Sequence, residues 1–109
     1  FVDTNMRIHE KLKTAYQASG EKEKASRQEG LMRLEKASLM WNRNEVRKSL
    51  VEFEGAVELV PDSAIAWFYL AETRRLLGDG SGARKAYELC LQLSPQHGRA
   101  RRGLARLSQ

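Results

Sequence analysis

The sequence predicts an all-α fold in which antiparallel helix pairs repeat along the chain, and three observations lead to this prediction. Shifting the 109-residue chain by 34 positions superposes residues of matching size and character. Pro61 and Pro95, which follow two apolar periodic segments, lie one such period apart. The composition, with 41% apolar residues, 30% charged residues and two prolines, is typical of a helix-rich chain with a folded core. A period of this length indicates helical repeats.

The superposed positions have clear physical roles. The pairs are Ala37 with Ala71, Asn44 with Gly78, Ser49 with Ala83, Phe53 with Tyr87, Ala56 with Cys90, Leu59 with Leu93 and Pro61 with Pro95. Small residues fit where two helices cross closely. Asn and Gly tolerate the left-handed backbone that closes a helix, and a proline cannot continue one. Each period therefore predicts one helix pair with an internal turn.

The resulting pattern predicts helices over residues 3–19, 22–43, 46–60, 63–77, 80–93 and 97–108. Gly20 and Asn44, both at turn positions, are 24 residues apart. The second helix of a degenerate first unit is therefore expected to run into the first helix of the next, which gives one long helix over residues 22–43. Asn44 and Gly78 are expected to close the first helix of their units, and Ser63 can cap the helix that follows Pro61.

The residues of the second period resemble the tetratricopeptide repeat family. The family pattern of Trp, Leu-Gly, Tyr, Ala, Phe and Pro reads here as Trp67, Leu70-Ala71, Arg74, Ala83, Tyr87 and Pro95. The resemblance implies a right-handed superhelical array of antiparallel helix pairs. It divides the chain into an N-terminal helical extension or degenerate repeat (1–29), two repeats (30–63 and 64–97) and a partial repeat with a capping helix (98–109).

No residue pattern in the sequence points to catalysis. His9 and His97 are isolated, and no histidine, cysteine and carboxylate set has metal-ligand spacing. Gly78, Gly80 and Gly82 follow a helix and lack the Lys and Ser/Thr of a phosphate loop. Cys90 falls at a packed position, where a reactive thiolate is not expected. We therefore expect a non-enzymatic module with no catalytic residue, no cofactor and no metal.

The resemblance implies that the first helix of each unit lines a concave groove for a peptide or helix of a partner protein, as in a scaffold or assembly adaptor. By spacing, the groove would grade from apolar to basic, which suits a partner with an apolar anchor and an acidic end. The alternative is that the first helix of the chain fills this surface. The expected groove residues are Leu34, Ser38, Trp41, Asn42, Phe68, Glu72, Arg75, Arg99, Arg102 and Arg106.

Other functions stay open at this stage. The net charge of +5 is concentrated in residues 84–109, which hold six basic residues and one acidic residue. The arginines from 99 to 106 could contact nucleic acid or an anionic surface, although no aromatic residues interleave with them. Exposed repeat edges could also join two copies of the chain. A clamp for chaperone tails, which would hold the tail carboxylate with Lys, Arg and Asn side chains, is disfavoured. Of the residues at the corresponding family positions, only Arg99 suits this task; the others are Leu34, Ser38, Tyr69 and Gly103.

Composition also bounds where the chain works. The longest apolar run, residues 64–71, is eight residues long, far short of the roughly twenty that span a bilayer. The single cysteine excludes an internal disulfide and favours the cytoplasm, with the periplasm as the alternative. A first residue other than Met indicates a piece of a longer protein.

Overall fold

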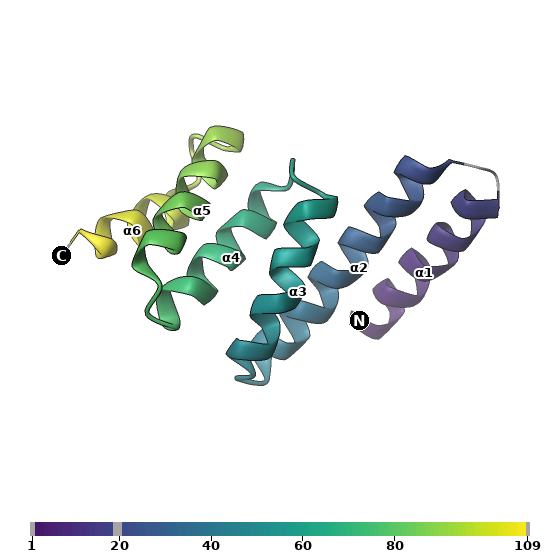
Figure 1. The fold of residues 1–109 in the computed structure, drawn as a ribbon, viewed down its shortest axis with the longest axis horizontal. Coiled ribbons are helices and arrows are strands. Elements are labelled where there is room, and N and C mark those ends of the chain that lie inside the picture. Colours follow the sequence, from purple (N-terminus) through teal and green to yellow (C-terminus); the bar gives the residue numbers. More distant parts are fainter. Residues whose placement is uncertain (1, 19–20, 109) are drawn as a thin grey trace. The chain divides into compact units, whose positions relative to one another are not determined.

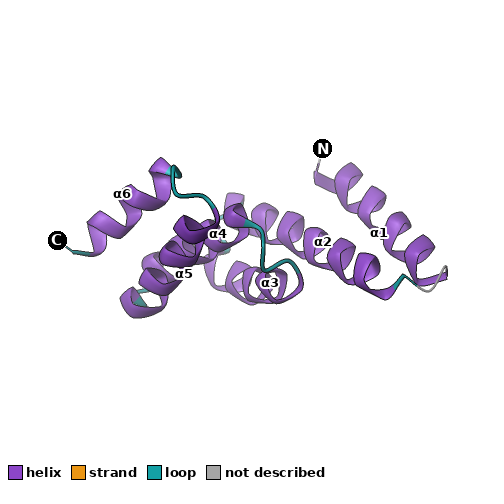
Figure 2. Ribbon diagram, turned by 90° about the horizontal axis from the view of Figure 1, so that it is seen from above, coloured by secondary structure: helices purple, strands orange, loops and turns teal. Residues whose placement is uncertain are grey.

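The structure, a computed structural model, describes the backbone of residues 2–18 and 21–108 and the side chains of residues 6–14 and 21–108. Helices occupy most of these ranges (Figures 1 and 2): α1 Val2–Ala18, α2 Lys22–Asn42, α3 Val46–Leu59, α4 Ala64–Leu76, α5 Gly80–Leu93 and α6 Gly98–Leu107. The chain forms two compact units, one with α1 to α3 that ends at Pro61 and one with α4 to α6 that begins at Asp62. We call them unit 1 and unit 2.

The predicted all-α fold is confirmed, and every helix begins and ends within one residue of its predicted range. Helix α2 is the long helix that the spacing of the turn residues predicted, although Gly20 lies outside the described residues. The division of the chain at residues 29/30, 63/64 and 97/98 stays a prediction. Among the described helices, none combines the length and the apolar character needed to cross a bilayer.

In unit 1, α2 and α3 pack tightly through small residues. Asn44 has a φ of 64° and so makes the left-handed turn expected after α2. Ala37, Phe53 and Ala56 are fully buried between the helices. A Cβ atom on Gly30 would lie 2.8 Å from Cβ of Leu59, so the glycine lets the end of α3 approach the backbone of α2.

Helix α1 packs on α2 and is held there by two polar contacts. The imidazole Nδ1 of His9 donates a hydrogen bond to Oε1 of Gln28 over 2.7 Å. The ammonium group of Lys13 forms an ion pair with the carboxylate of Glu29, and both side chains are 25% exposed. The hydrogen bond from Lys13 holds the pKa of Glu29 below its ordinary value of 4.5. The same bond raises the pKa of Lys13 above 10.5.

In unit 2, turns and caps follow the repeat pattern. Gly78 has a φ of +88° in the turn between α4 and α5. The Ser63 hydroxyl accepts a hydrogen bond from the Ala66 amide over 3.2 Å at the start of α4, as predicted. Gly80 and Gly82 form the first turn of α5, where Oδ1 of Asp79 accepts a bond from the Gly82 amide over 2.9 Å. Gly78 therefore forms the turn, and Gly80 and Gly82 belong to the start of the next helix.

Tyr87 lies at the centre of unit 2. Its side chain is fully buried, and its ring faces α6 at Gly103. A Cβ atom on Gly103 would lie 2.4 Å from Cζ of Tyr87, far closer than atoms can pack. The glycine therefore allows α6 to lie against the ring and cover this end of α5.

We expect the contact between α1 and α2 to depend on pH. Because the pKa of Glu29 is lowered on folding, its contribution is present above pH 4.5 and is lost as the pH falls through the folded value. Because the pKa of Lys13 is raised, its contribution is present below pH 10.5 and is lost at higher pH. The protection of the α1 amides, which is their exchange rate compared with that of an unfolded peptide at the same pH, should be greatest between these limits. Glu29→Gln should remove the loss of α1 protection at low pH, whereas the exposed Lys11→Met should keep it. An unchanged loss at low pH in Glu29→Gln would show that Glu29 does not hold α1 on α2.

Gly103→Ala should destabilise unit 2. The added methyl group collides with the buried ring of Tyr87, which is expected to lower the free energy of unfolding by about 1–3 kcal/mol. Urea denaturation followed by circular dichroism measures the effect. Gly80→Ala is the matched control, because no atom lies within 4 Å of its added Cβ and alanine favours the helix. Equal stabilities of the two variants would show that α6 does not pack against Tyr87 as described.

Candidate functional site

Three arginines form one flank of α6. Arg99, Arg102 and Arg106 are spaced by three and four residues, so they share one side of the helix, and all three are exposed. The adjoining face of α6 is buried through Ala100 and Gly103. We call Arg99, Arg102 and Arg106 the arginine flank. It is a positively charged surface held in place by the packing of α6 on unit 2.

Helix α6 begins at a histidine cap that also packs against an aromatic ring. Nδ1 of His97 accepts a hydrogen bond from the Ala100 amide over 3.1 Å. The imidazole lies 5.0 Å from the ring of Phe68, centroid to centroid, with an interplanar angle of 33°. His97 therefore both starts α6 and fixes its first turn on α4.

Arg99 is positioned by two aromatic rings of α4. Its guanidinium carbon lies 4.3 Å from the centroid of the Phe68 ring and 5.8 Å from that of Tyr69. Both distances are within the range of a cation–π interaction. Phe68 is only 3% exposed, and its ring forms the platform under Arg99. Its place in a peptide-binding groove stays a prediction.

Glu72 and Arg75 form a second polar cluster, around Tyr87. Nη2 and Nε of Arg75 lie 2.5 Å and 3.0 Å from Oε2 of Glu72. Nε of Arg75 also donates to the Tyr87 hydroxyl over 3.2 Å. Glu72 raises the pKa of Arg75, and burial raises the pKa of Tyr87. The two side chains neutralise each other and tie α4 to α5, so they add no net charge to the surface.

The four remaining expected groove residues lie on α2 in unit 1. Leu34, Ser38 and Trp41 are half-buried and Asn42 is exposed. The Ser38 hydroxyl donates a hydrogen bond to the Leu34 carbonyl oxygen over 3.0 Å, so it is engaged within its own helix. The structure thus brings Phe68, Glu72 and Arg75 together around Tyr87, and it places Arg99 over Phe68. A single groove that also includes the α2 residues stays a prediction.

The sequence did not reveal the roles of His97 and Tyr69. His97 has no metal-ligand partners in the sequence, but its place directly before the Gly98 start of α6 is an N-cap position. Tyr69 neighbours Phe68 on α4, with the two ring centroids 5.4 Å apart. A search for capping residues at the predicted helix starts would have found the histidine. The stacking depends on how α6 packs, which no local pattern encodes.

The chemistry that this site offers is ion pairing and hydrogen bonding. Within the described ranges, no group of three or more His, Cys, Asp and Glu residues could hold a metal ion. Cys90 is buried, and burial raises the pKa of its thiol, so the thiolate is disfavoured. The exposed guanidinium groups of the arginine flank suit carboxylates, which they can bind with two parallel hydrogen bonds.

Comparison with known proteins gives matches of three kinds. Residues 65–107 match the family model of the tetratricopeptide repeat. Protein O-mannosyl-transferase TMTC1 of Mus musculus is 32% identical over 74 residues, which are 68% of this chain and 8% of that protein. The chain thus corresponds to a small part of this relative.

The third match is a solved structure, the first TPR of Spaghetti (RPAP3) bound to the HSP90 peptide SRMEEVD. It superposes with a TM-score of 0.73 and 19% sequence identity, over 97% of this chain and 92% of that chain. This likeness bears out the fold that the repeat pattern predicted. The chain is a member of the tetratricopeptide repeat family, and residues 65–107 carry the matching repeat.

Proposed function

We propose that this module binds an acidic segment of a partner protein at the arginine flank of α6 and catalyses no reaction. The observation that carries the proposal is the stack of Arg99 on Phe68. A side chain already held in place loses less rotamer freedom when it pairs with a carboxylate. The structural neighbour solved with a bound peptide of a partner protein supports a role in protein interaction.

The flank favours carboxylates along a segment over a single terminal carboxylate. In the peptide SRMEEVD, seen on the neighbour, acidic residues follow one another near the end. In this chain, however, Gly103 packs on Tyr87 and has no side chain to offer, and Tyr69 carries no charge. We therefore propose that Arg102 and Arg106 bind carboxylates beside Arg99. In this proposal the apolar part of the segment contacts Leu34, Ser38, Trp41 and Asn42. This part of the proposal rests on the family pattern alone.

Charge reversal of Arg102 tests the proposal. The probe is a fluorescein-labelled 12-residue peptide with an apolar half and an acidic half, and its twin carries Asn and Gln in place of Asp and Glu. Fluorescence anisotropy should show that the acidic peptide binds more tightly and that added salt weakens its binding. Loss of a charge-assisted hydrogen bond costs about 1.5–3 kcal/mol, so Arg102→Glu should lower the affinity about tenfold or more. Phe68→Ala is unsuitable, because Phe68 is buried.

Lys85→Glu provides the matched control. Lys85 is exposed on α5, and its reversal changes the net charge by the same amount away from the flank. Equal binding of the two peptides, or equal losses in Arg102→Glu and Lys85→Glu, would refute the proposal. Tighter binding of a single-stranded oligonucleotide would favour a nucleic-acid contact, and a molecular mass that rises with concentration would favour self-association.

A further inference from the structure

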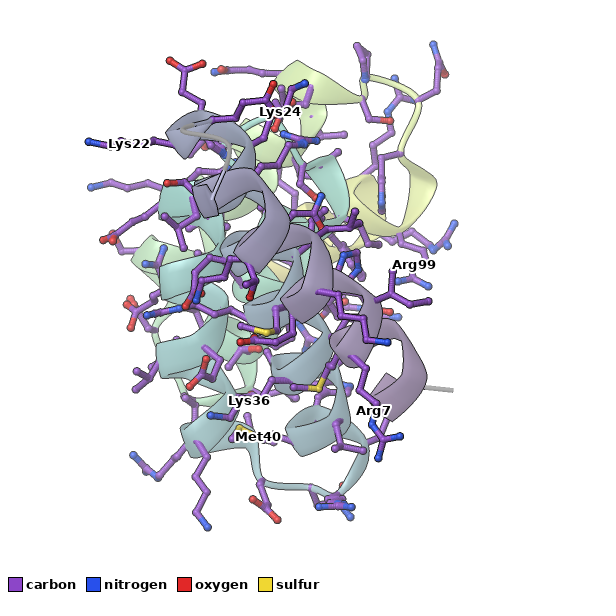
Figure 3. All side chains as sticks on the ribbon, turned by 90° about the vertical axis from the view of Figure 1, so that its right-hand side faces the viewer. Arg7, Lys22, Lys24, Lys36, Met40 and Arg99 are labelled. Carbon is purple, nitrogen blue, oxygen red and sulfur yellow. The ribbon has the colours of Figure 1, made fainter. Side chains whose placement is uncertain are left out.

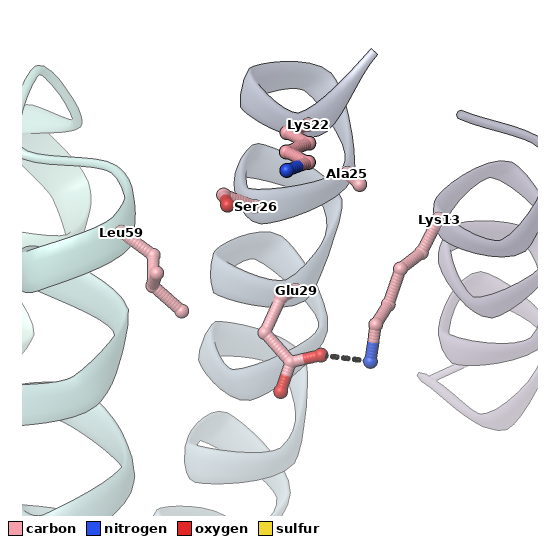
Figure 4. Close-up of a pocket in the computed structure, with 6 residues that line it drawn as sticks. All are labelled: Lys13, Lys22, Ala25, Ser26, Glu29 and Leu59. Atoms are coloured by element: carbon pink, nitrogen blue, oxygen red, sulfur yellow. Dashed lines mark ion pairs between the residues drawn. The ribbon is translucent and has the colours of Figure 1, made fainter. Parts of the chain in front are cut away.

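A hollowed surface in unit 1 lies on the side of α2 that faces both α1 and α3. A pocket of about 620 Å³ is lined by Lys13, Lys22, Ala25, Ser26, Glu29 and Leu59. A second pocket of about 510 Å³ is lined by Met6, Glu29, Met32, Arg33, Lys36, Val51 and Glu52. Figure 4 shows the first pocket, with Leu59 and Lys13 on opposite sides of Glu29. Glu29 lines both pockets, so they form one continuous surface, which we call the α2 trough.

The apolar side chains of the α2 trough are accessible to a partner in part. Val51 is 64% exposed on α3, and Met6 and Met32 are half-buried. Leu59 adds an apolar wall in the first pocket. Methionine side chains are flexible and polarisable, so they adapt to the shape of an apolar partner. Both pockets can therefore accept an apolar side chain.

The polar rim of the α2 trough has an excess of positive charge. Glu29 is shared by Lys13 and by Arg33, whose Nε lies 3.5 Å from Oε1 of the carboxylate. Lys36 pairs with Glu52 over 3.5 Å. Lys22 adds a further cation, so four basic side chains face two carboxylates. The two carboxylates already have partners, and the excess positive charge selects acidic groups on an occupant.

The length of the α2 trough fits a short helix. Lys22 and Lys36 lie toward opposite ends of α2 (Figure 3), and fourteen helical residues span about 21 Å. The centres of the two pockets are separated by about two helical turns along α2, or about 10 Å. Side chains at positions i and i+7 of a bound helix have this separation. A third helix packed along two others also buries apolar surface in the way that helical bundles do.

We propose that the α2 trough binds an amphipathic helix of a partner protein that carries two apolar residues seven positions apart and carboxylates on both sides of them. The apolar residues enter the two pockets. The flanking carboxylates pair with Lys22 at one end and, at the other end, join the ion pairs that Lys36 and Arg33 form with Glu52 and Glu29. This surface is distinct from the arginine flank and does not depend on the function proposed for that flank.

The probe for this proposal is a 15-residue helix stabilised by a lactam bridge, with Leu at positions 4 and 11 and Glu at both ends. Its twin has Lys in place of Glu. Fluorescence anisotropy should show saturable binding of the acidic helix alone. Val51→Glu and Lys22→Glu should each weaken binding about tenfold, because each places a negative charge against the acidic helix. Both residues are exposed, so circular dichroism should show an unchanged helix content.

Two controls separate the possible outcomes. Lys85→Glu and Arg102→Glu in unit 2 should each change the affinity for this helix less than about twofold, since charges outside the contact act weakly. The absence of saturable binding, equal binding of the basic twin, or a loss seen only with Arg102→Glu would overturn the proposal. Sedimentation velocity completes the test. A dimer of the free protein that Val51→Glu dissociates would show that a second copy occupies the trough, which also overturns it.

Discussion

The contact between Tyr87 and Gly103 determines where α6 can lie. Tyr87 is a large buried side chain at a position where α4, α5 and α6 meet, and the absence of a side chain at Gly103 lets α6 reach its ring. Phe68 and Tyr87 are also neighbours, with ring centroids 6.3 Å apart. Once α6 is placed, His97 and Arg99 stack on Phe68 and the arginine flank faces solvent. The candidate binding surface thus follows from the packing of one aromatic cluster.

Helix α2 plays a comparable part in unit 1. Its glycine at position 30 admits the end of α3, and its glutamate at position 29 holds Lys13 of α1. Arg33 extends toward Gly55 of α3, where a Cβ atom would lie 2.2 Å from the guanidinium group. Three neighbouring positions on α2 therefore determine how α1 and α3 pack on it. Because α1 and α3 both pack on α2, the surface between their contacts becomes a trough lined by both apolar and charged side chains.

The sequence was sufficient to predict the helices but not the exposure of the site residues. Asn44, Gly78 and the two prolines act locally, so spacing alone located the turns and the helix ends. The burial of Phe68 depends on α6, which lies about thirty residues further along the chain. No helical periodicity distinguishes a ring that faces a ligand from one that faces another helix. The α2 trough was missed for a related reason, because α1 lies outside the clear repeat and its contacts could not be aligned with those of later helices.

The most direct test of the account is amide hydrogen exchange in a Tyr87→Leu variant, compared with the unmodified protein. Leucine keeps an apolar group in the core but removes the ring against which α6 packs. The account predicts that residues 98–107 exchange much faster while most amides of α4 and α5 stay protected, and that the acidic peptide loses affinity. If α6 stays as protected as before and the peptide binds equally well, Tyr87 does not position the arginine flank.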